Sequence, residues 1–177
     1  MLFPADQCVL EKGEIVVLCV ASGMQGVNLP RLTVDGKPVL WERFKPPALV
    51  ARVNLSPGKH VIAVGKNELR VFVRDGENPG AAPEGWPVLR THLGNVEQCR
   101  ECAACHEVAT NEGVQAVSAP QEPAACFRCH AEGQLEAIHF HPQEPLNSCH
   151  MCHALHGSAN NALLRGPVKQ LCAACHD

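Results

Sequence analysis

The chain has 177 residues and a formal net charge of −3, with 15 Lys and Arg residues against 18 Asp and Glu residues. This length accommodates one large domain or two small ones, and the slight acidity argues against a nucleic-acid-binding surface. The apolar runs, such as residues 15–21, are too short to cross a bilayer. Aromatic residues make up only 4% of the chain, so we expect something other than aromatic side chains to fill part of its core.

The cysteines and histidines are numerous and unevenly distributed. The chain contains 11 cysteines and 10 histidines, but only Cys8 and Cys19 lie within the first 98 residues. The other nine cysteines lie between Cys99 and Cys175. Such a number indicates disulfides, metal sites or cofactor attachment, and the distribution divides the chain into two parts.

Residues 1–74 have the pattern of an all-β domain. Residues 14–21 form a β-branched run, Asp35-Gly36 is a tight-turn dipeptide, and apolar and polar residues alternate over 48–55 and 69–73. Six or seven short strands at spacings of about ten residues predict an Ig-like β-sandwich that serves as a docking or scaffold domain, with a small barrel as the alternative. His60 is interpreted as a solvated strand residue.

The alternating pattern ends after this part of the chain. Residues 75–87 (DGENPGAAPEGWP) contain three glycines and three prolines, which predicts an interdomain linker. Residues 88–177 are predicted to form a second domain of short helices and loops with little regular secondary structure.

The second part contains a repeated C-x-x-C-H motif. Its first cysteines are 23 or 24 residues apart, and this motif is the attachment signature of haem c. The thiols add to the vinyl groups of the porphyrin, and the histidine becomes the proximal iron ligand. The sequence therefore predicts four haem c groups, each with its iron. The predicted attachment residues are Cys102, Cys105, Cys126, Cys129, Cys149, Cys152, Cys172 and Cys175. The predicted proximal ligands are His106, His130, His153 and His176.

The paired cysteines also fit two patterns that involve no haem. Two C-x-x-C pairs about twenty residues apart describe a zinc ribbon, so four pairs would provide two zinc sites. Zinc does not explain the histidine after every second cysteine, and a disulfide scaffold explains neither the pairing nor the histidines. We therefore favour haem c.

The remaining histidines bear on the sixth ligand of each iron. His150 lies between the two cysteines of the third motif and is poorly placed to reach the distal face of that haem. Met151 also lies inside that motif, which makes methionine ligation a poor alternative. Four histidines then remain for four irons: His92, His139, His141 and His156. Bis-histidine ligation closes each iron to substrate, so we expect an electron carrier with no catalytic residue rather than an enzyme.

Residues 139–158 (HFHPQEPLNSCHMCHALHGS) and 163–176 (LLRGPVKQLCAACH) resemble the doubled C-x-x-C-H repeat of multihaem c-type cytochromes, and the resemblance covers residues 92–177. In that family the second histidine of a C-H-x-x-H element usually ligates a neighbouring haem, which here implies His156. The upstream histidine corresponds to His141 or His139, and which of them serves which haem stays open. The family also implies alternating stacked and perpendicular haem pairs that form the core.

Haem c is attached outside the cytoplasm, so we expect an extracellular, cell-surface or periplasmic protein without a transmembrane segment. No signal peptide is visible in residues 1–6, which suggests a mature or truncated form, or a start that was set too late. We expect a disulfide between Cys8 and Cys19, with two buried free thiols as the alternative. Cys99 is expected to be free or to bridge to another subunit.

The partners follow from the same resemblance. Small tetrahaem cytochromes similar to this chain polymerise into extracellular filaments, so one expectation is a homopolymeric nanowire. The alternatives are a soluble periplasmic shuttle that meets other redox proteins and an electron-donating subunit of a larger complex. A multihaem reductase would need an open haem site, and the histidine count argues against it. No nucleic-acid partner is expected.

Overall fold

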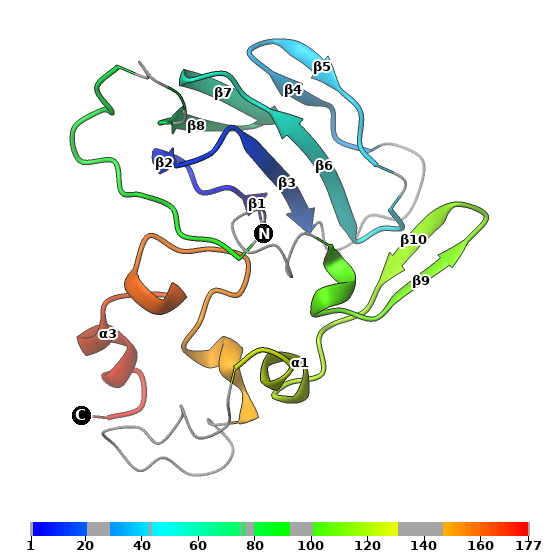
Figure 1. Cartoon of the computed structure of the whole chain (residues 1–177), viewed down its shortest axis with the longest axis vertical. Coiled ribbons are helices and arrows are strands. Elements are labelled where there is room, and N and C mark those ends of the chain that lie inside the picture. Colours follow the sequence, from blue (N-terminus) through cyan, green and yellow to red (C-terminus); the bar gives the residue numbers. More distant parts are fainter. Residues whose placement is uncertain are drawn as a thin grey trace.

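A computed structural model describes residues 2–20, 29–42, 44–74, 76, 80–92, 101–130 and 147–176. Figure 1 shows two parts, with the strands of the N-terminal half in the upper region and short helical turns and loops of the C-terminal half below them. The prediction of an all-β sandwich followed by a loop-rich second part is confirmed.

The first sheet of the sandwich has three antiparallel strands in the order β1-β3-β6. These strands are β1 (Leu2–Phe3), β3 (Glu14–Val20) and β6 (Ala48–Asn54). β3 and β6 pair along their whole length, from Glu14 opposite Asn54 to Val20 opposite Ala48. Both strands are rich in valine, whose branched side chain suits the pleated surface of a sheet.

The second sheet has five strands in the order β2-β8-β7-β4-β5. Its strands are β2 (Cys8–Leu10), β4 (Leu32–Val34), β5 (Lys37–Val39), β7 (Gly58–Val64) and β8 (Asn67–Val73). β2 runs parallel to β8, and the other pairs are antiparallel. The expected turn at Asp35-Gly36 joins β4 to β5, and both residues have the positive φ angles (50° and 76°) that a type I′ hairpin requires.

The core lies between the two sheets and consists mostly of aliphatic side chains. Val17 from the first sheet and Ile62 and Val71 from the second are each 0% exposed. They belong to one buried cluster that draws on both sheets. This cluster gives the N-terminal half a hydrophobic core of its own.

His60 on β7 differs from the expectation of a solvated residue, because its side chain is only 10% exposed. Its Nδ1 lies 2.7 Å from a carboxylate oxygen of Asp35, and its Nε2 lies 2.7 Å from the carbonyl oxygen of Ser56. The turn that carries Asp35 therefore folds over the imidazole and shields it.

Cys8 and Cys19 are both free thiols, so the disulfide expected between them is not formed. Cys8 lies on β2 of the five-stranded sheet, whereas Cys19 lies on β3 of the other sheet. The two strands are therefore not hydrogen-bonded neighbours. Burial raises the pKa of Cys8 to about 12, which keeps it a protonated, inert thiol.

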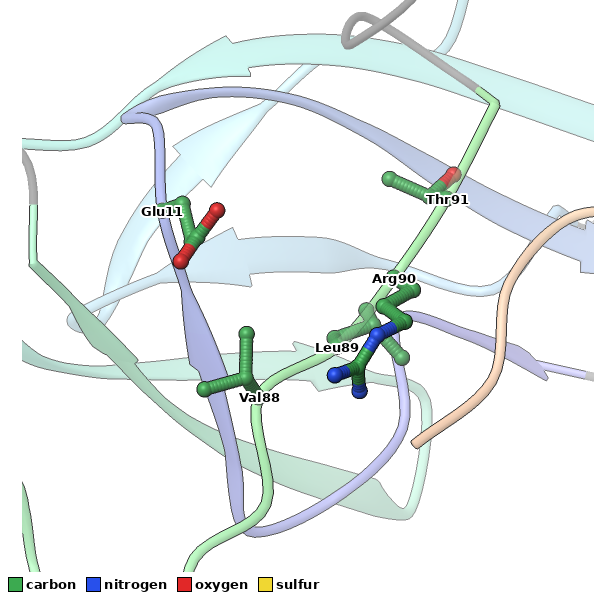
Figure 2. Close-up of a pocket in the computed structure, with 5 residues that line it drawn as sticks. All are labelled: Glu11, Val88, Leu89, Arg90 and Thr91. Carbon is green, nitrogen blue, oxygen red and sulfur yellow. The ribbon is translucent and has the colours of Figure 1, made fainter. Parts of the chain in front are cut away.

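The end of the predicted linker is attached to the sandwich. The backbone N–H of Val9 donates to Pro87 and that of Leu89 donates to Val9, both at 2.8 Å. Val88 thus forms a parallel bridge with Val9 beside β2, and the side chain of Leu89 enters the core. Figure 2 shows residues 88–91 beside the chain that carries Glu11, and these five residues line a depression at this edge. The chain therefore enters its second part hydrogen-bonded to the edge strand β2 of the sheet.

The second part contains one element that the sequence pattern did not predict. A β-hairpin of β9 (Val108–Asn111) and β10 (Val114–Val117) separates the first two motifs. It lies against the sandwich, because the backbone N–H of Lys45 donates to Gln115 at 2.7 Å. The helical elements are η2 (Cys102–Ala104), α1 (Ala124–Phe127), η4 (Cys149–Met151), η5 (Asn161–Leu163) and α3 (Val168–Cys172). Within the described ranges, no helix is long and apolar enough to span a membrane.

Candidate haem-binding sites

The four C-x-x-C-H motifs adopt the same backbone conformation. In each motif the N–H of the histidine donates to the carbonyl of the first cysteine, at distances between 2.9 and 3.0 Å. The N–H of the second cysteine donates to the same carbonyl at 3.1–3.3 Å. Each motif is thus a single helical turn, and residues three and four positions apart share one face of such a turn. The two thiols and the imidazole of each motif are therefore presented together, as attachment of a haem requires.

The residues around these turns explain why they form. Two alanines, which have the highest helix propensity, separate the cysteines of the first and fourth motifs. Pro123 directly precedes α1 and Pro167 directly precedes α3. Proline has a backbone φ that suits the start of a helix and lacks an N–H that would be unsatisfied there. These residues therefore favour short helical turns at the positions of the motifs.

The cysteines of the motifs are available for covalent attachment. All eight are free thiols, and the second cysteine of every motif is exposed. Cys102, Cys126 and Cys149, the first cysteines of the first three motifs, are half-buried. A thioether to a porphyrin needs such free thiols, so the donor set fits haem c. Cys99 lies outside the described residues.

Hydrogen bonds at Nδ1 orient two of the predicted proximal histidines. Nδ1 of His106 lies 2.6 Å from the carbonyl oxygen of Ser118, and Nδ1 of His153 lies 2.7 Å from that of Ala162. A carbonyl only accepts hydrogen bonds, so these contacts place the proton on Nδ1. Nε2 then keeps the lone pair that a metal binds, in the arrangement common to metal-ligating histidines.

Two predicted distal histidines lie beside predicted proximal ones. The rings of His106 and His156 are nearly parallel, with an interplanar angle of 7° and centroids 6.0 Å apart. The rings of His92 and His130 have centroids 6.1 Å apart and planes inclined at 62°. The structure therefore brings together one proximal and one distal candidate for each of the first two motifs. His139 and His141 lie outside the described residues.

The backbone of His156 is fixed by the chain that leaves the sandwich. Arg90 and Ser158 exchange two backbone hydrogen bonds of 2.8 and 2.9 Å, and the hydroxyl of Thr91 donates to the carbonyl of His156. Gly157 lies so close to Phe3 of β1 that a Cβ there would be 2.6 Å from the ring and 2.9 Å from the carbonyl oxygen of Arg90. Only glycine fits at this point.

Burial determines the charge state of His156. It lowers the pKa of the imidazole, and a smaller decrease comes from the neighbouring His106. The side chain is therefore neutral at pH 7, which is the form that binds metals.

The first motif is joined to the sandwich by charge and by packing. Arg52 on β6 donates to Glu42 at 2.6 Å and to Glu101 at 3.2 Å, and Glu101 directly precedes Cys102. Cys102 packs against the hydrophobic core, and burial raises the pKa of its thiol. Sequence reasoning missed these supporting residues, because neither Arg52 nor Glu42 belongs to a recognisable motif.

The second and third motifs meet at their first cysteines. Burial, followed by a hydrogen bond with Cys149, raises the pKa of Cys126 to about 12. Glu122 also links these motifs, because its carboxylate lies 2.8 Å from Nδ1 of His150 and accepts the backbone N–H of His150 at 3.1 Å. The attachment points of the second and third motifs are therefore adjacent, and His150 has a partner other than an iron.

The arrangement of the same side chains bears on the zinc alternative. In the described ranges, no group of three or more His, Cys, Asp or Glu side chains converges in a way that could hold a metal ion. Each pair of motif cysteines is instead carried on its own helical turn with its own histidine, and Cys126 and Cys149 contact each other across two motifs.

Comparison with known proteins supports the haem interpretation for one stretch of the chain. Residues 143–177, which contain the third and fourth motifs, match the family described as the doubled CXXCH motif. This match is consistent with a c-type cytochrome that binds haem covalently. No curated protein and no solved structure matches the chain. The first two motifs lie outside the matched stretch and are assigned from their residues and their turn geometry.

Proposed function

We propose that the chain is a tetrahaem c-type cytochrome that transfers electrons and catalyses no reaction of its own. The observation that carries this proposal is the shared helical turn of all four motifs, which presents two thiols and an imidazole on one face each time. When bound, haem c supplies an iron that cycles between two oxidation states. The cysteines fix each porphyrin, and the motif histidines bind the irons from one side.

Irons that have two histidine ligands each favour an electron carrier over an enzyme. His156 and His92 lie beside His106 and His130, at spacings that suit ligands on the two faces of a haem. An iron with two protein ligands has no position for a substrate, and its role is then restricted to electron transfer. His139 and His141 are proposed as the remaining distal ligands.

Short distances between the motifs favour electron transfer from haem to haem. First cysteines recur every 23 or 24 residues, and Cys126 and Cys149 are in contact. The porphyrins attached there must therefore have neighbouring edges. A row of such centres forms a conduit along the second half of the chain.

The cellular role is proposed from the same chemistry. Attachment of haem c takes place outside the cytoplasm, so we propose an extracellular, cell-surface or periplasmic location. In the finer form of the proposal, copies of the chain assemble into a conducting filament. The sandwich offers edge strands for such contacts, although Pro38 in the edge strand β5 removes one backbone donor there. The alternatives are a periplasmic shuttle and an electron-donating subunit of a larger complex.

The haem content tests the proposal directly. The full chain would be produced in cells that attach haem c, and its intact mass and bound metals would be measured. We expect a mass increase of four haems and no zinc. The double variant Cys126→Ala/Cys129→Ala should carry three haems, and the Cys8→Ala control should carry four. A wild-type chain with zinc and without haem would contradict the proposal.

Assembly of the chain into filaments requires a different measurement from the haem content. Cryo-electron microscopy of the native secreted protein should show continuous filaments if the finer form is correct. Isolated particles with intact haems would contradict the filament and favour the shuttle or the subunit of a larger complex.

A further inference from the structure

The distance between the two rings of each histidine pair can be compared with the distance expected for two ligands of one iron. A metal–nitrogen bond to histidine is about 2.0 Å and the nitrogen lies about 1.1 Å from its ring centroid, so imidazoles on opposite faces of one iron have centroids about 6.2 Å apart. The pairs His106–His156 and His92–His130 have centroids 6.0 and 6.1 Å apart. Simple ring packing also covers this range of distances, so the hydrogen bonds of the ring nitrogens provide a second observation.

The hydrogen bonds of the ring nitrogens are compatible with coordination of one iron by each pair. Nδ1 of His106 is bonded to the carbonyl of Ser118, and Nδ1 of His92 lies 3.4 Å from the carbonyl of Leu155. In each pair, one ring therefore has its Nδ1 directed to a backbone oxygen and its Nε2 left with a free lone pair. This arrangement leaves one nitrogen in each pair in the form that binds a metal.

We infer that His156 is the second ligand of the iron held at the first motif, opposite His106, and that His92 is the second ligand at the second motif, opposite His130. This inference rests on the proposed function and assigns two of its distal ligands. The first haem would thus be bound by the first motif and by His156, three residues after the third motif. The second haem would be bound by the second motif and by His92, on the segment that leaves the sandwich.

A single antiparallel bridge between Arg90 and Ser158 positions both proposed distal ligands. His92 lies two residues after Arg90, and His156 lies two residues before Ser158. This bridge is anchored on the sandwich through Leu89, which is 3% exposed, and through the contact of Gly157 with Phe3. The β-sandwich therefore acts as a positioning scaffold for the ligands of the first two irons.

The two pairs should have different magnetic signatures. The parallel planes of His106 and His156 (7°) remove the near-degeneracy of two iron d orbitals, which gives a rhombic ferric signal in electron paramagnetic resonance. The planes of His92 and His130 (62°) leave these orbitals closer in energy, which gives a strongly anisotropic signal. Axial ligands control the electronic state of a haem, so the two irons can be told apart.

The test uses the full haem-loaded chain with the variants His156→Ala and His92→Ala. Intact mass should show four haems in both, because the attaching cysteines are unchanged. Each variant should convert one low-spin iron to high spin, with loss of a rhombic signal in His156→Ala and of an anisotropic signal in His92→Ala. The His150→Ala control should retain the wild-type spectrum, because His150 is bonded to Glu122.

Two further measurements distinguish a vacant ligand position from misfolding. Added imidazole should restore the low-spin state in both alanine variants. His156→Met should give one low-spin iron with histidine–methionine ligation and a higher reduction potential. An unchanged number of low-spin irons in either alanine variant, or loss of the opposite signal, would overturn the assignment. A wild-type chain without haem would instead refute the proposed function.

Discussion

The two halves of the molecule differ in what fills their interiors. Among the described residues, every buried hydrophobic side chain except Ala125 belongs to residues 3–89. The β half thus has a core of aliphatic side chains, whereas the described residues of the half with the four motifs contribute almost none. A chain segment cannot stay folded without burying apolar surface. In the proposed tetrahaem protein, porphyrins would supply in the second half what valine, leucine and isoleucine supply in the first.

The largest expected effect follows from removing the haems. If the full chain is produced without haem attachment, residues 101–130 and 147–176 should lose their fold while the sandwich keeps its own. Hydrogen exchange should show strong protection in β3, β6, β7 and β8 and almost none around the motifs. Equal protection of both halves in the haem-free chain would contradict this division of the molecule.

The second prediction concerns the side-chain core of the sandwich. Ile62→Ala removes a fully buried side chain and should lower the free energy of unfolding by about 2–5 kcal/mol. The neighbouring Val61 is 39% exposed, so Val61→Ala should cost much less. Urea unfolding followed by far-ultraviolet circular dichroism measures both, and the haem content should stay the same. Equal losses in the two variants would show that the core is placed wrongly.

The third prediction concerns the contact between the halves. Gly157→Ala places a methyl group against Phe3 and the carbonyl of Arg90, so it should destabilise the chain by about 1–3 kcal/mol and displace His156. The fraction of low-spin iron should fall together with the stability. Gly166→Ala is the matched control, because its nearest neighbour would be 3.8 Å away. An unperturbed spectrum in Gly157→Ala would show that the contact of Gly157 with Phe3 and Arg90 does not position His156.

The smallest expected effect is the acid sensitivity of two carboxylates on the sandwich. The hydrogen bonds from Arg70 lower the pKa of Asp6. Burial raises the pKa of Asp35, but the hydrogen bonds from Val61 and His60 outweigh it and leave this pKa lowered as well.

Both groups bind fewer protons in the folded state than in the unfolded state, so their stabilisation is present above a pH of about 3.9 and is lost as the pH falls through the folded pKa values. The Asp6–Arg70 pair is largely exposed and the Asp35 side chain is 45% exposed, so the contribution of each carboxylate to stability should be small. Urea unfolding at pH 7 and pH 3 should show a smaller acid loss in Asp6→Asn than in the wild type. An identical pH profile would mean that the Asp6–Arg70 pair contributes nothing.

How much the sequence could predict depended on the range of the interactions involved. The strands and the turn at Asp35-Gly36 follow from local alternation and turn chemistry, and the prediction of a sandwich was confirmed. The β9–β10 hairpin was missed because its turn, Glu112-Gly113, lacks the Asn or Asp that usually marks a type I′ turn. The bridge of Val88 to β2 was missed because the proline-rich and glycine-rich composition before it is typical of a free linker.

The candidate sites show the same division. The motifs identify the cysteines and the proximal histidines, because their spacing within one helical turn is local. No local pattern connects His156 with His106, or His92 with His130, because these pairs form only when distant segments meet. The support from Phe3 and Arg90 is likewise long-range, and the disulfide expected between Cys8 and Cys19 was wrong because sequence proximity did not make their strands neighbours.

The sharpest test of a chain of four closed haems is a reductive titration of the full haem-loaded protein, followed by exposure to carbon monoxide. Four bis-histidine irons should take up four electrons per chain and form no carbon monoxide adduct. Uptake of fewer electrons, or an adduct in the wild-type spectrum, would show a missing haem or an open iron and would contradict the proposed tetrahaem carrier.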